Sequence, residues 1–449
     1  MDIKDPKKRR KIIRDKRQYA SFARLQKFLF FGTLTGVFIL SLIFPLRPKV
    51  SNIEKRELTR FPSVTISSFL DGSFQNQLST WFADTFPFRE GLISLNSNFK
   101  SLYGKNSVKI VKKTARPNVE TKEVAKETKK ADPVEEEKLP DGTITVIPET
   151  AGDVYVTEDR AFSLFYFTEK ASKAYSDMIN KAKTKLGDVN VYSLVVPTSS
   201  GVNLDDKVVK DLGASSQKDA IKDLYGRIKE GVTTIDAFTS LKAHNSEYLY
   251  FRTDHHWTQL GARYAFEAFA KEKGFTPSPL SAYKKMEIPG FIGTFYASSN
   301  QDPGLKKNPD TVEAYIPRST NDMKYIGKNG KVSDWKIVFD VTGWNPASLY
   351  NAFIAGDNPL AIIDNPEKND DENIVVIKES YGNAFIPFLT DHYDKVFVVD
   401  FRYFRSYKKY NNDLVRFIKE NKVKDVLFIN NTEAAFNVGV SNSIENMFK

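Results

Sequence analysis

One stretch of the chain, residues 28–45, runs for eighteen residues without a charged side chain and is rich in Phe, Leu, Ile and Val. At about 1.5 Å per residue, a helix of this length spans roughly 27 Å, close to the hydrocarbon thickness of a bilayer. A buried helix of a soluble protein normally keeps a polar face, and this stretch shows none. A cleavable signal peptide is the alternative, but the run is long for one, and residues 45–48, Pro-Leu-Arg-Pro, lack the small-x-small cleavage pattern. The sequence therefore predicts one uncleaved transmembrane helix.

The formal net charge of +10 is concentrated in front of this helix. Residues 1–27 carry eleven Lys and Arg against three Asp, whereas the remaining 422 residues hold 55 basic and 53 acidic side chains. Basic segments beside a transmembrane helix stay on the cytoplasmic side, and only Arg47 and Lys49 follow it closely. We therefore expect a cytoplasmic tail of residues 1–27 and an extracellular location for residues 46–449. A nucleic-acid-binding domain carries its basic excess on its folded part, so no nucleic-acid partner is predicted.

Residues 46–111 predict a membrane-proximal helical segment. Phe74, Leu78 and Trp81 recur in it at helical spacing, and a Pro-Phe-Arg sequence at residues 87–89 interrupts the pattern.

The composition changes abruptly at residues 112–139. This segment has no aromatic residue, and 15 of its 28 residues are charged, so it cannot bury enough apolar surface to offset the entropy of ordering. It predicts a disordered linker, with a solvated helix of Glu and Lys as the alternative. Residues 140–449 then form the candidate catalytic domain. The chain contains no cysteine, which excludes disulfides, thiolate metal sites and cysteine nucleophiles.

In the last 310 residues, strand-like and helix-like runs alternate, which is typical of an α/β fold with a parallel sheet covered by helices on both faces. We expect strands at residues 189–197, 373–377, 395–400 and 425–430, and helices at residues 170–186, 217–232, 259–273 and 406–421.

Two separate stretches carry candidate chemistry. Residues 253–258 read Thr-Asp-His-His-Trp-Thr and lead into a helix; if they are extended, Asp254 and His256 point to the same side and His255 to the other. Ser380 directly follows a buried strand and stands where ligands bind in open α/β sheets. His256 could accept the serine proton while Asp254 orients the imidazole, and the backbone N–H groups after Ser380 could bind an oxyanion.

Other interpretations of the same residues remain open. A serine after a strand is more often a turn residue or helix cap, and an Asp-x-His pair alone is weak evidence. A metal could be held by Asp254, His255 and His256, with Asp391 or His392 added, although the chain has no H-x-H or H-x-x-x-H spacing. We expect no metal and no cofactor, since the chain also lacks nucleotide-binding glycine motifs.

The hexapeptide at residues 253–258 resembles the signature of the DHHW family, a branch of the alginate O-acetyltransferase-like (AlgX/AlgJ type) proteins in the SGNH hydrolase-like superfamily. Residues 377–389 and 399–404 resemble the family's serine region, and residues 54–62 and 86–89 its membrane-proximal motif. The resemblance implies a flavodoxin-like SGNH fold, in which the triad is Ser380, His256 and Asp254.

This sequence departs from the family pattern at two points. The superfamily's Gly-Asp-Ser motif reads Glu379-Ser380 here, and Thr is expected in the alginate enzymes where His255 stands.

Six further residues, His255 among them, are candidates for binding the substrate or the oxyanion. Asn383 could donate to an oxyanion or satisfy backbone groups; Arg402 could hold an anionic group or form a structural ion pair. Trp257 and Tyr381, with Tyr403, could stack on sugars or belong to the core.

The resemblance implies an extracellular, membrane-anchored serine O-acyltransferase that acetylates a cell-surface or secreted polysaccharide through an acyl-serine. Acetyl-CoA is cytoplasmic, so a membrane-bound O-acyltransferase partner would supply the acyl group. The alternatives are a polysaccharide deacetylase or carbohydrate esterase with the same triad, and a non-catalytic cell-envelope scaffold.

Overall fold

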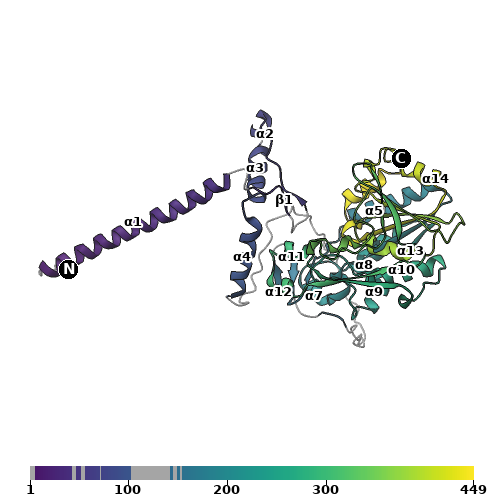
Figure 1. The fold of residues 1–449 in the computed structure, drawn as a ribbon, viewed down its shortest axis with the longest axis horizontal. Helices are drawn as coiled ribbons and strands as arrows, with labels where there is room; N and C mark the ends of the chain where they lie inside the picture. The colour runs from purple at the N-terminus through teal and green to yellow at the C-terminus, as the bar shows by residue number, and fades with distance from the viewer. Residues whose placement is uncertain are drawn as a thin grey trace, which may run out of the picture. The chain divides into compact units, whose positions relative to one another are not determined.

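The computed structural model describes residues 6–42, 47–51, 56–70, 72–102, 142–144, 149–151 and 154–448 (Figure 1). The chain separates into two compact units, Met1–Asn96 and Ser97–Lys449. The predicted linker at residues 112–139 lies outside the described residues, and its disorder stays a prediction.

The first unit begins with α1 (Pro6–Leu42), a helix that includes a 21-residue candidate membrane span, Tyr19–Ile39, none of which is buried. This span starts nine residues before the predicted one and is compatible with a single-pass anchor or a signal sequence. The predicted interruption at residues 87–89 is confirmed, because one helix ends at Asp84 and the next begins at Arg89. The other elements of this unit are β1 (Val50–Ser51), β2 (Arg56–Glu57), α2 (Ile66–Leu70), α3 (Ser73–Asp84) and α4 (Arg89–Leu102), which continues into the second unit.

The second unit is built on an eight-stranded sheet. Five of its strands are parallel, as the alternation predicts. The sequence analysis missed one of these, at residues 232–235, and three antiparallel strands at one edge of the sheet. In spatial order the strands are β11 (Val332–Lys336), β10 (Asp322–Ile326), β12 (Leu360–Asp364), β14 (Lys395–Asp400), β13 (Asn373–Lys378), β15 (Val423–Asn431), β6 (Asn190–Val196) and β7 (Val232–Ile235).

Strand β13 lies at the point where the sheet changes direction. The chain leaves β13 through α13 (Gly382–Leu389) to β14 on one side, then returns through α14 (Leu414–Glu420) to β15 on the other. Numbered in chain order, the parallel strands run 4-3-5-1-2 across the sheet. This is the 2-1-3-4-5 arrangement of flavodoxin-like folds with β6 and β7 placed at the start of the chain instead of at its end. Ligands of such sheets bind at this switch point, at the carboxyl ends of the strands, and Ser380 follows β13 there.

Helices cover both faces of the sheet because buried side chains alternate along the central strands. On β13, Ile374 and Val376 pack into one apolar core and Val375 and Ile377 into the other. The first core includes α9 (Ala237–Ala243), α10 (Gln259–Lys273) and α13; the second includes α5 (Glu169–Leu186), α8 (Gln217–Gly226), α14 and α16 (Val438–Glu445).

The predicted helices at residues 217–232 and 406–421 are too long. The first ends at Gly226, and the chain then enters β7. The second begins only at Leu414, because Asn411 and Asn412 adopt positive φ angles of 45° and 64°, which a helix does not accommodate.

Shorter elements surround the sheet. They are β3 (Glu149–Ala151), β4 (Val154–Val156), β5 (Ala161–Phe162), α6 (Ser199–Asn203), α7 (Asp206–Asp211), η2 (Leu280–Ala282), β8 (Lys284–Phe291), α11 (Thr294–Ser298), α12 (Pro303–Lys307), β9 (Asp310–Ile316), η3 (Pro346–Ala352), η4 (Phe404–Ser406) and α15 (Thr432–Ala435).

The turn after β13 requires glycine at position 382. A Cβ added at Gly382 would lie 2.6 Å from Cβ of Lys378 and 3.3 Å from Cγ2 of Ile429. Gly382→Ala should therefore lower the free energy of unfolding by about 1–3 kcal/mol, measured by urea denaturation of the detergent-solubilised chain. Gly226→Ala, at a helical site with open space around it, is the matched control and should be neutral or stabilising. Equal stability of the two variants would contradict this account of the turn.

Candidate active site

The loop of residues 251–256 is held at its base by backbone pairing. Tyr250 and Trp257 form an antiparallel bridge, and the N–H of Phe251 donates to the carbonyl of His256 over 3.2 Å. Thr258 then caps α10, its Oγ1 accepting from the N–H of Gly261. The segment is therefore the irregular lead-in to a helix that the sequence predicts.

This loop brings three predicted residues together in one hydrogen-bonded line. Ser380 Oγ lies 2.7 Å from His256 Nε2, and Nδ1 of the same ring lies 2.5 Å from Asp254 Oδ1. Asp254 and His256 are buried, whereas Ser380 is partly exposed. A hydroxyl, an imidazole and a carboxylate in this order can transfer the hydroxyl proton to the ring.

Asp254 is fixed in its ionised form. Its Oδ2 accepts from the backbone N–H of Thr294 over 2.7 Å and from the Thr294 hydroxyl over 3.0 Å. A Cβ at Gly293 would lie 2.2 Å from Cβ of Asp254, so only glycine leaves room for this carboxylate. Burial acts to raise the pKa of Asp254, but the two histidines and Thr294 outweigh it and hold this pKa well below its usual range.

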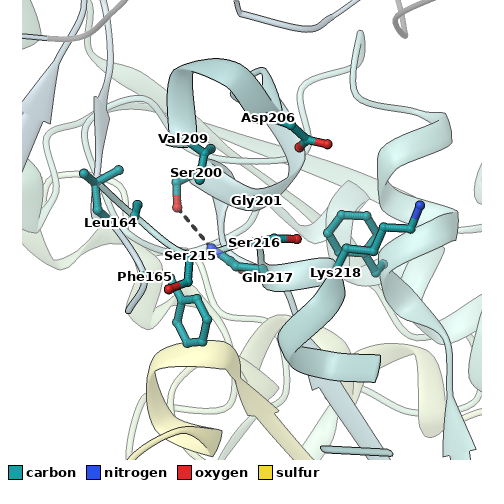
Figure 2. Close-up of a pocket in the computed structure, with 12 residues that line it drawn as sticks. Leu164, Phe165, Ser200, Gly201, Asp206, Val209, Ser215, Ser216, Gln217 and Lys218 are labelled. Atoms are coloured by element: carbon teal, nitrogen blue, oxygen red, sulfur yellow. Dashed lines mark hydrogen bonds between the residues drawn. The ribbon is translucent and has the colours of Figure 1, made fainter. Parts of the chain in front are cut away.

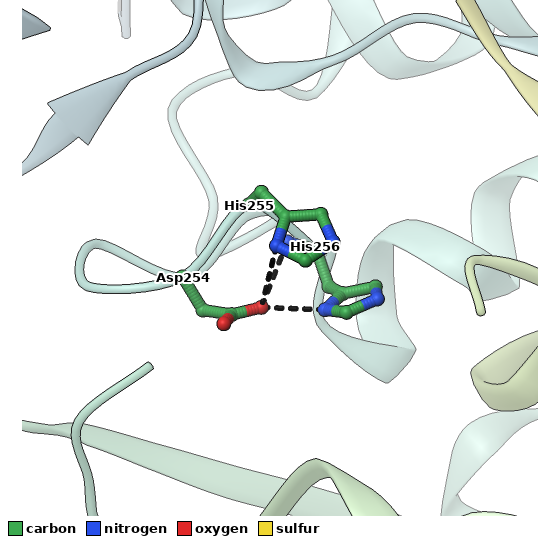
Figure 3. A group of neighbouring side chains, drawn as sticks. All are labelled: Asp254, His255 and His256. Atoms are coloured by element: carbon green, nitrogen blue, oxygen red, sulfur yellow. Dashed lines mark hydrogen bonds and ion pairs between the residues drawn. The ribbon is translucent and has the colours of Figure 1, made fainter. Parts of the chain in front are cut away.

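His255 does not point to the opposite side, as the extended-chain argument expects. Its ring centroid lies 3.8 Å from that of His256, and its Nδ1 lies 2.7 Å from the Thr294 hydroxyl, because the loop is a tight turn (Figure 3). The Thr294 hydroxyl has one proton, and it donates this proton to Asp254 Oδ2, because an ionised carboxylate can only accept. In the second hydrogen bond of Thr294, His255 Nδ1–H is therefore the donor and the hydroxyl oxygen the acceptor. Burial and the neighbouring His256 lower the pKa of His255.

The backbone N–H groups after Ser380 do not form the expected oxyanion site. The N–H of Tyr381 donates to Glu379 Oε2 over 2.9 Å, and those of Gly382 and Asn383 donate to the carbonyls of Glu379 and Ser380. Among the described residues, only the N–H of Ser380 itself has no acceptor in this turn. Glu379 is buried, and burial raises its pKa.

Trp257 and Tyr381 do not offer a stacking surface, because both side chains are fully buried. They instead join the two halves of the site. Trp257 Nε1 donates to the carbonyl of Tyr381 over 2.9 Å, and the Tyr381 hydroxyl donates to the carbonyl of His255. Tyr403, whose ring lies 3.6 Å from Lys328 Nζ, is half-buried.

Tyr350 is a site residue that the sequence analysis missed. Its ring stacks on that of His256 with centroids 4.0 Å apart, and its hydroxyl donates to the Ser380 carbonyl over 3.1 Å. It lies on η3, and no local pattern in the sequence links it to either motif.

Asn383 and Arg402 contact a partly buried ion cluster at the end of β13. Asn383 Nδ2 donates to Asp357, and Arg402 pairs with Asp357 over 2.8 Å and with Asp400 over 2.6 Å. Lys378 Nζ lies 3.0 Å from Asp357 and 3.1 Å from Asp400. Asn383 is 1% exposed, which leaves it no access to an oxyanion.

Asp254, His255 and His256 could each supply one ligand atom to a metal, since these atoms lie within 4.8 Å of one another. Asp391 and His392 are not part of that group. A metal would have to displace the bonds of Asp254 to His256 and Thr294, so the donor set fits a proton relay better.

Comparison with known proteins identifies the family of the chain. The family model of the DHHW protein matches residues 54–127 and 124–399. This chain belongs to the DHHW family. A DHHW family protein of Eubacterium siraeum DSM 15702 is 31% identical, with 66% of this chain and 98% of that chain covered and a TM-score of 0.57. The predicted α/β fold, a parallel sheet flanked by helices, is confirmed.

Two further solved structures are similar at low sequence identity. Bacillus cereus PatB1 with a sulfonyl adduct is 16% identical, covering 63% of this chain and 95% of that one, with a TM-score of 0.52. The O-acetyltransferase domain of Pseudomonas putida AlgJ is 14% identical, covering 66% and 99%, with a TM-score of 0.36. No curated protein matches the chain.

The ion cluster of Lys378, Arg402, Asp357 and Asp400 leads to a prediction about stability. Lys378 is 1% exposed and pairs with two carboxylates, so Lys378→Met leaves Arg402 as the only cation, among the described residues, that pairs with Asp357 and Asp400. We expect a loss of about 3 kcal/mol or more in the free energy of unfolding, measured by urea denaturation. Lys271→Met, on the exposed side of α10, should change little. A Lys378→Met variant as stable as this control would contradict a structural role for the cluster.

Proposed function

We propose that this protein is a serine O-acyltransferase, an O-acetyltransferase in the first instance, that modifies a cell-surface or secreted polysaccharide. The observation that carries the proposal is the line Ser380–His256–Asp254, with a partly exposed hydroxyl 2.7 Å from a buried imidazole. Metal ligation explains these contacts less well, because every donor in the line already has a matching acceptor.

In the first half-reaction, Ser380 Oγ attacks the carbonyl carbon of an acyl ester while its proton moves to His256 Nε2. Asp254 stabilises the imidazolium, and the N–H of Ser380, for which the turn provides no acceptor, is the backbone donor proposed for the developing oxyanion. When the tetrahedral intermediate collapses, the donor alkoxide leaves with the proton from Nε2, and the acyl group stays on Ser380.

In the second half-reaction, a sugar hydroxyl gives its proton to His256 Nε2 and attacks the acyl carbon. Ser380 Oγ then leaves and takes this proton back, so the enzyme returns to its starting state. The Tyr350 ring stacked on His256 supports both steps, because it holds the imidazole in place.

The acyl donor follows from the proposed location. If α1 anchors the chain with its basic end in the cytoplasm, the site lies outside and cannot draw on cytoplasmic acetyl-CoA. A membrane-bound O-acyltransferase partner, which the family resemblance implies, would deliver the acyl group across the bilayer.

The serine gives the first test. Ser380→Ala should abolish both covalent labelling by a fluorophosphonate and acetylation of the polymer in cells, because no other group in the line can carry the acyl group. Ser443→Ala, an exposed serine on α16, is the control and should keep both. Unchanged acetylation in Ser380→Ala would discredit the assignment.

Two results would favour the other functions. Release of acetate from a model ester without transfer to any glycan indicates an esterase. An intact Ser380 that no fluorophosphonate labels indicates a scaffold.

The absence of cysteine in the chain allows a clean topology test. Cysteine introduced at Asn442, exposed on α16, should react with a membrane-impermeant maleimide on intact cells. Cysteine at Asp2 should react only after lysis, because residues 1–27 remain cytoplasmic. Loss of the Asp2→Cys label from the mature chain would instead show a cleaved signal peptide.

A further inference from the structure

A pocket of about 570 Å³ lies within the first unit of the structure. Residues 47–50 and 57–61, which include parts of β1 and β2, form most of its wall, and Trp81 and Thr85 line it from the end of α3. Sites for small ligands usually measure about 300–1,000 Å³, so this pocket has the size of a ligand site.

Two pockets of the second unit are far smaller. One is lined by Ser200 and Gln217, whose side chains are joined by a hydrogen bond of 3.1 Å (Figure 2), and the other lies beside His255. Each leaves about 10 Å³, which is room for about one water molecule. The pocket of the first unit is therefore the better candidate for a ligand site.

This pocket lies next to the end of the candidate membrane span. The ring of Phe82 on α3 is 6.5 Å from that of Phe38, in the last turn of the span, and 4.9 Å from the guanidinium of Arg47. If α1 spans the bilayer as proposed, Arg47 lies at the level of the lipid headgroups. Trp81 and Phe61, whose ring centroids are 4.8 Å apart, both line the pocket, and aromatic side chains are typical of this level.

The charge of the pocket is positive. Arg47, Lys49 and Arg60 line it, against one carboxylate, that of Glu57. Glu57 pairs with Arg60 over 3.0 Å, whereas neither Arg47 nor Lys49 forms an ion pair within the described part of the chain. Two cations in the wall of the pocket are thus left without a counter-charge.

Arg47 is held in place beneath the pocket. Its side chain is 8% exposed, its guanidinium lies 3.9 Å from the centre of the Trp81 ring, and its Nη1 donates to Thr85 Oγ1 over 2.7 Å. Its Nε and Nη2 are buried and have no hydrogen-bond partner. A buried cation without a counter-charge is costly, so an anion in the pocket would stabilise this arrangement through its charge.

Direct contact with an anion falls to Lys49 and Arg60, whose side chains are exposed at the rim of the pocket. The apolar part of a ligand would meet Leu58 and the ring of Phe61. A neutral ligand could use these apolar groups but would leave the two cations unpaired.

We infer that this pocket binds the phosphate headgroup of an anionic phospholipid, with phosphatidylglycerol as the representative case. Basic side chains beside a membrane helix attract such lipids, and the rings beside them contact the glycerol and the first methylene groups. A bound lipid would hold the residues after α1 at the bilayer surface. The inference depends on α1 lying in the bilayer and not on the chemistry of Ser380.

Photo-crosslinking of the full chain in phosphatidylcholine nanodiscs tests this site. A phosphatidylglycerol with a photoreactive group beside its glycerol is added, and mass spectrometry of the digested chain locates the label. We expect label on residues 61–89, which include Phe61, Trp81 and Thr85, at least about fivefold above that from a phosphatidylcholine probe of the same design. Anionic lipid attracted by the basic tail at residues 1–27 would label other peptides.

The double variant Lys49→Gln, Arg60→Gln removes the two exposed cations and should lower this label about tenfold. The control is Lys207→Gln with Lys210→Gln, two exposed lysines of α7, which loses the same charge and should keep the label.

Three results would overturn the inference: the two lipid probes label residues 61–89 equally, the double variant takes up as much label as the control, or a millimolar excess of inorganic phosphate removes the label. The last result would show a site for free phosphate instead of a lipid. Labelling requires no turnover, so a failure of the acyl-transfer tests would leave this inference standing.

Discussion

The structure of the site depends on one hydrogen bond, from Ser380 Oγ to His256 Nε2, between residues 124 positions apart in the chain. Two further bonds, from Trp257 to the Tyr381 carbonyl and from Tyr381 to the His255 carbonyl, tie the same two segments together. Because these rings are fully buried, the serine and the imidazole cannot separate without exposing a large aromatic surface. The aromatic residue of the DHHW motif therefore aligns the reacting groups rather than contacting a substrate.

The charged side chains around Ser380 form two separate groups. On one side, Asp254 is held ionised by its neighbours and can stabilise a positive imidazole. On the other, Lys378, Asp357, Asp400 and Arg402 neutralise one another at the end of β13. The second group gives the strand end a fixed shape, and its charges are too well paired to bind a substrate anion.

The parallel part of the sheet and the meeting of Asp254, His256 and Ser380 could be predicted, because buried strands and the chemistry of a proton relay leave local signals in the sequence. The directions in which individual side chains point could not be predicted from the sequence. His255 lies beside His256 because the loop turns tightly, and Asn383 faces Asp357 across the fold. Tyr350 reaches His256 from η3, and β10 and β11 are short strands with many exposed side chains. Contacts between residues far apart in the sequence determine these side-chain orientations and strands, so local sequence patterns do not predict them.

The central claim is that Ser380 carries the acyl group between donor and acceptor. Mass spectrometry of the wild-type chain, quenched in acid during turnover with an activated acetyl ester and then digested, tests it most directly. The account predicts an acetyl group on the peptide that contains Ser380, which disappears when an acceptor glycan is added. A Ser380 peptide that stays unmodified while acetate is released or transferred would contradict the account.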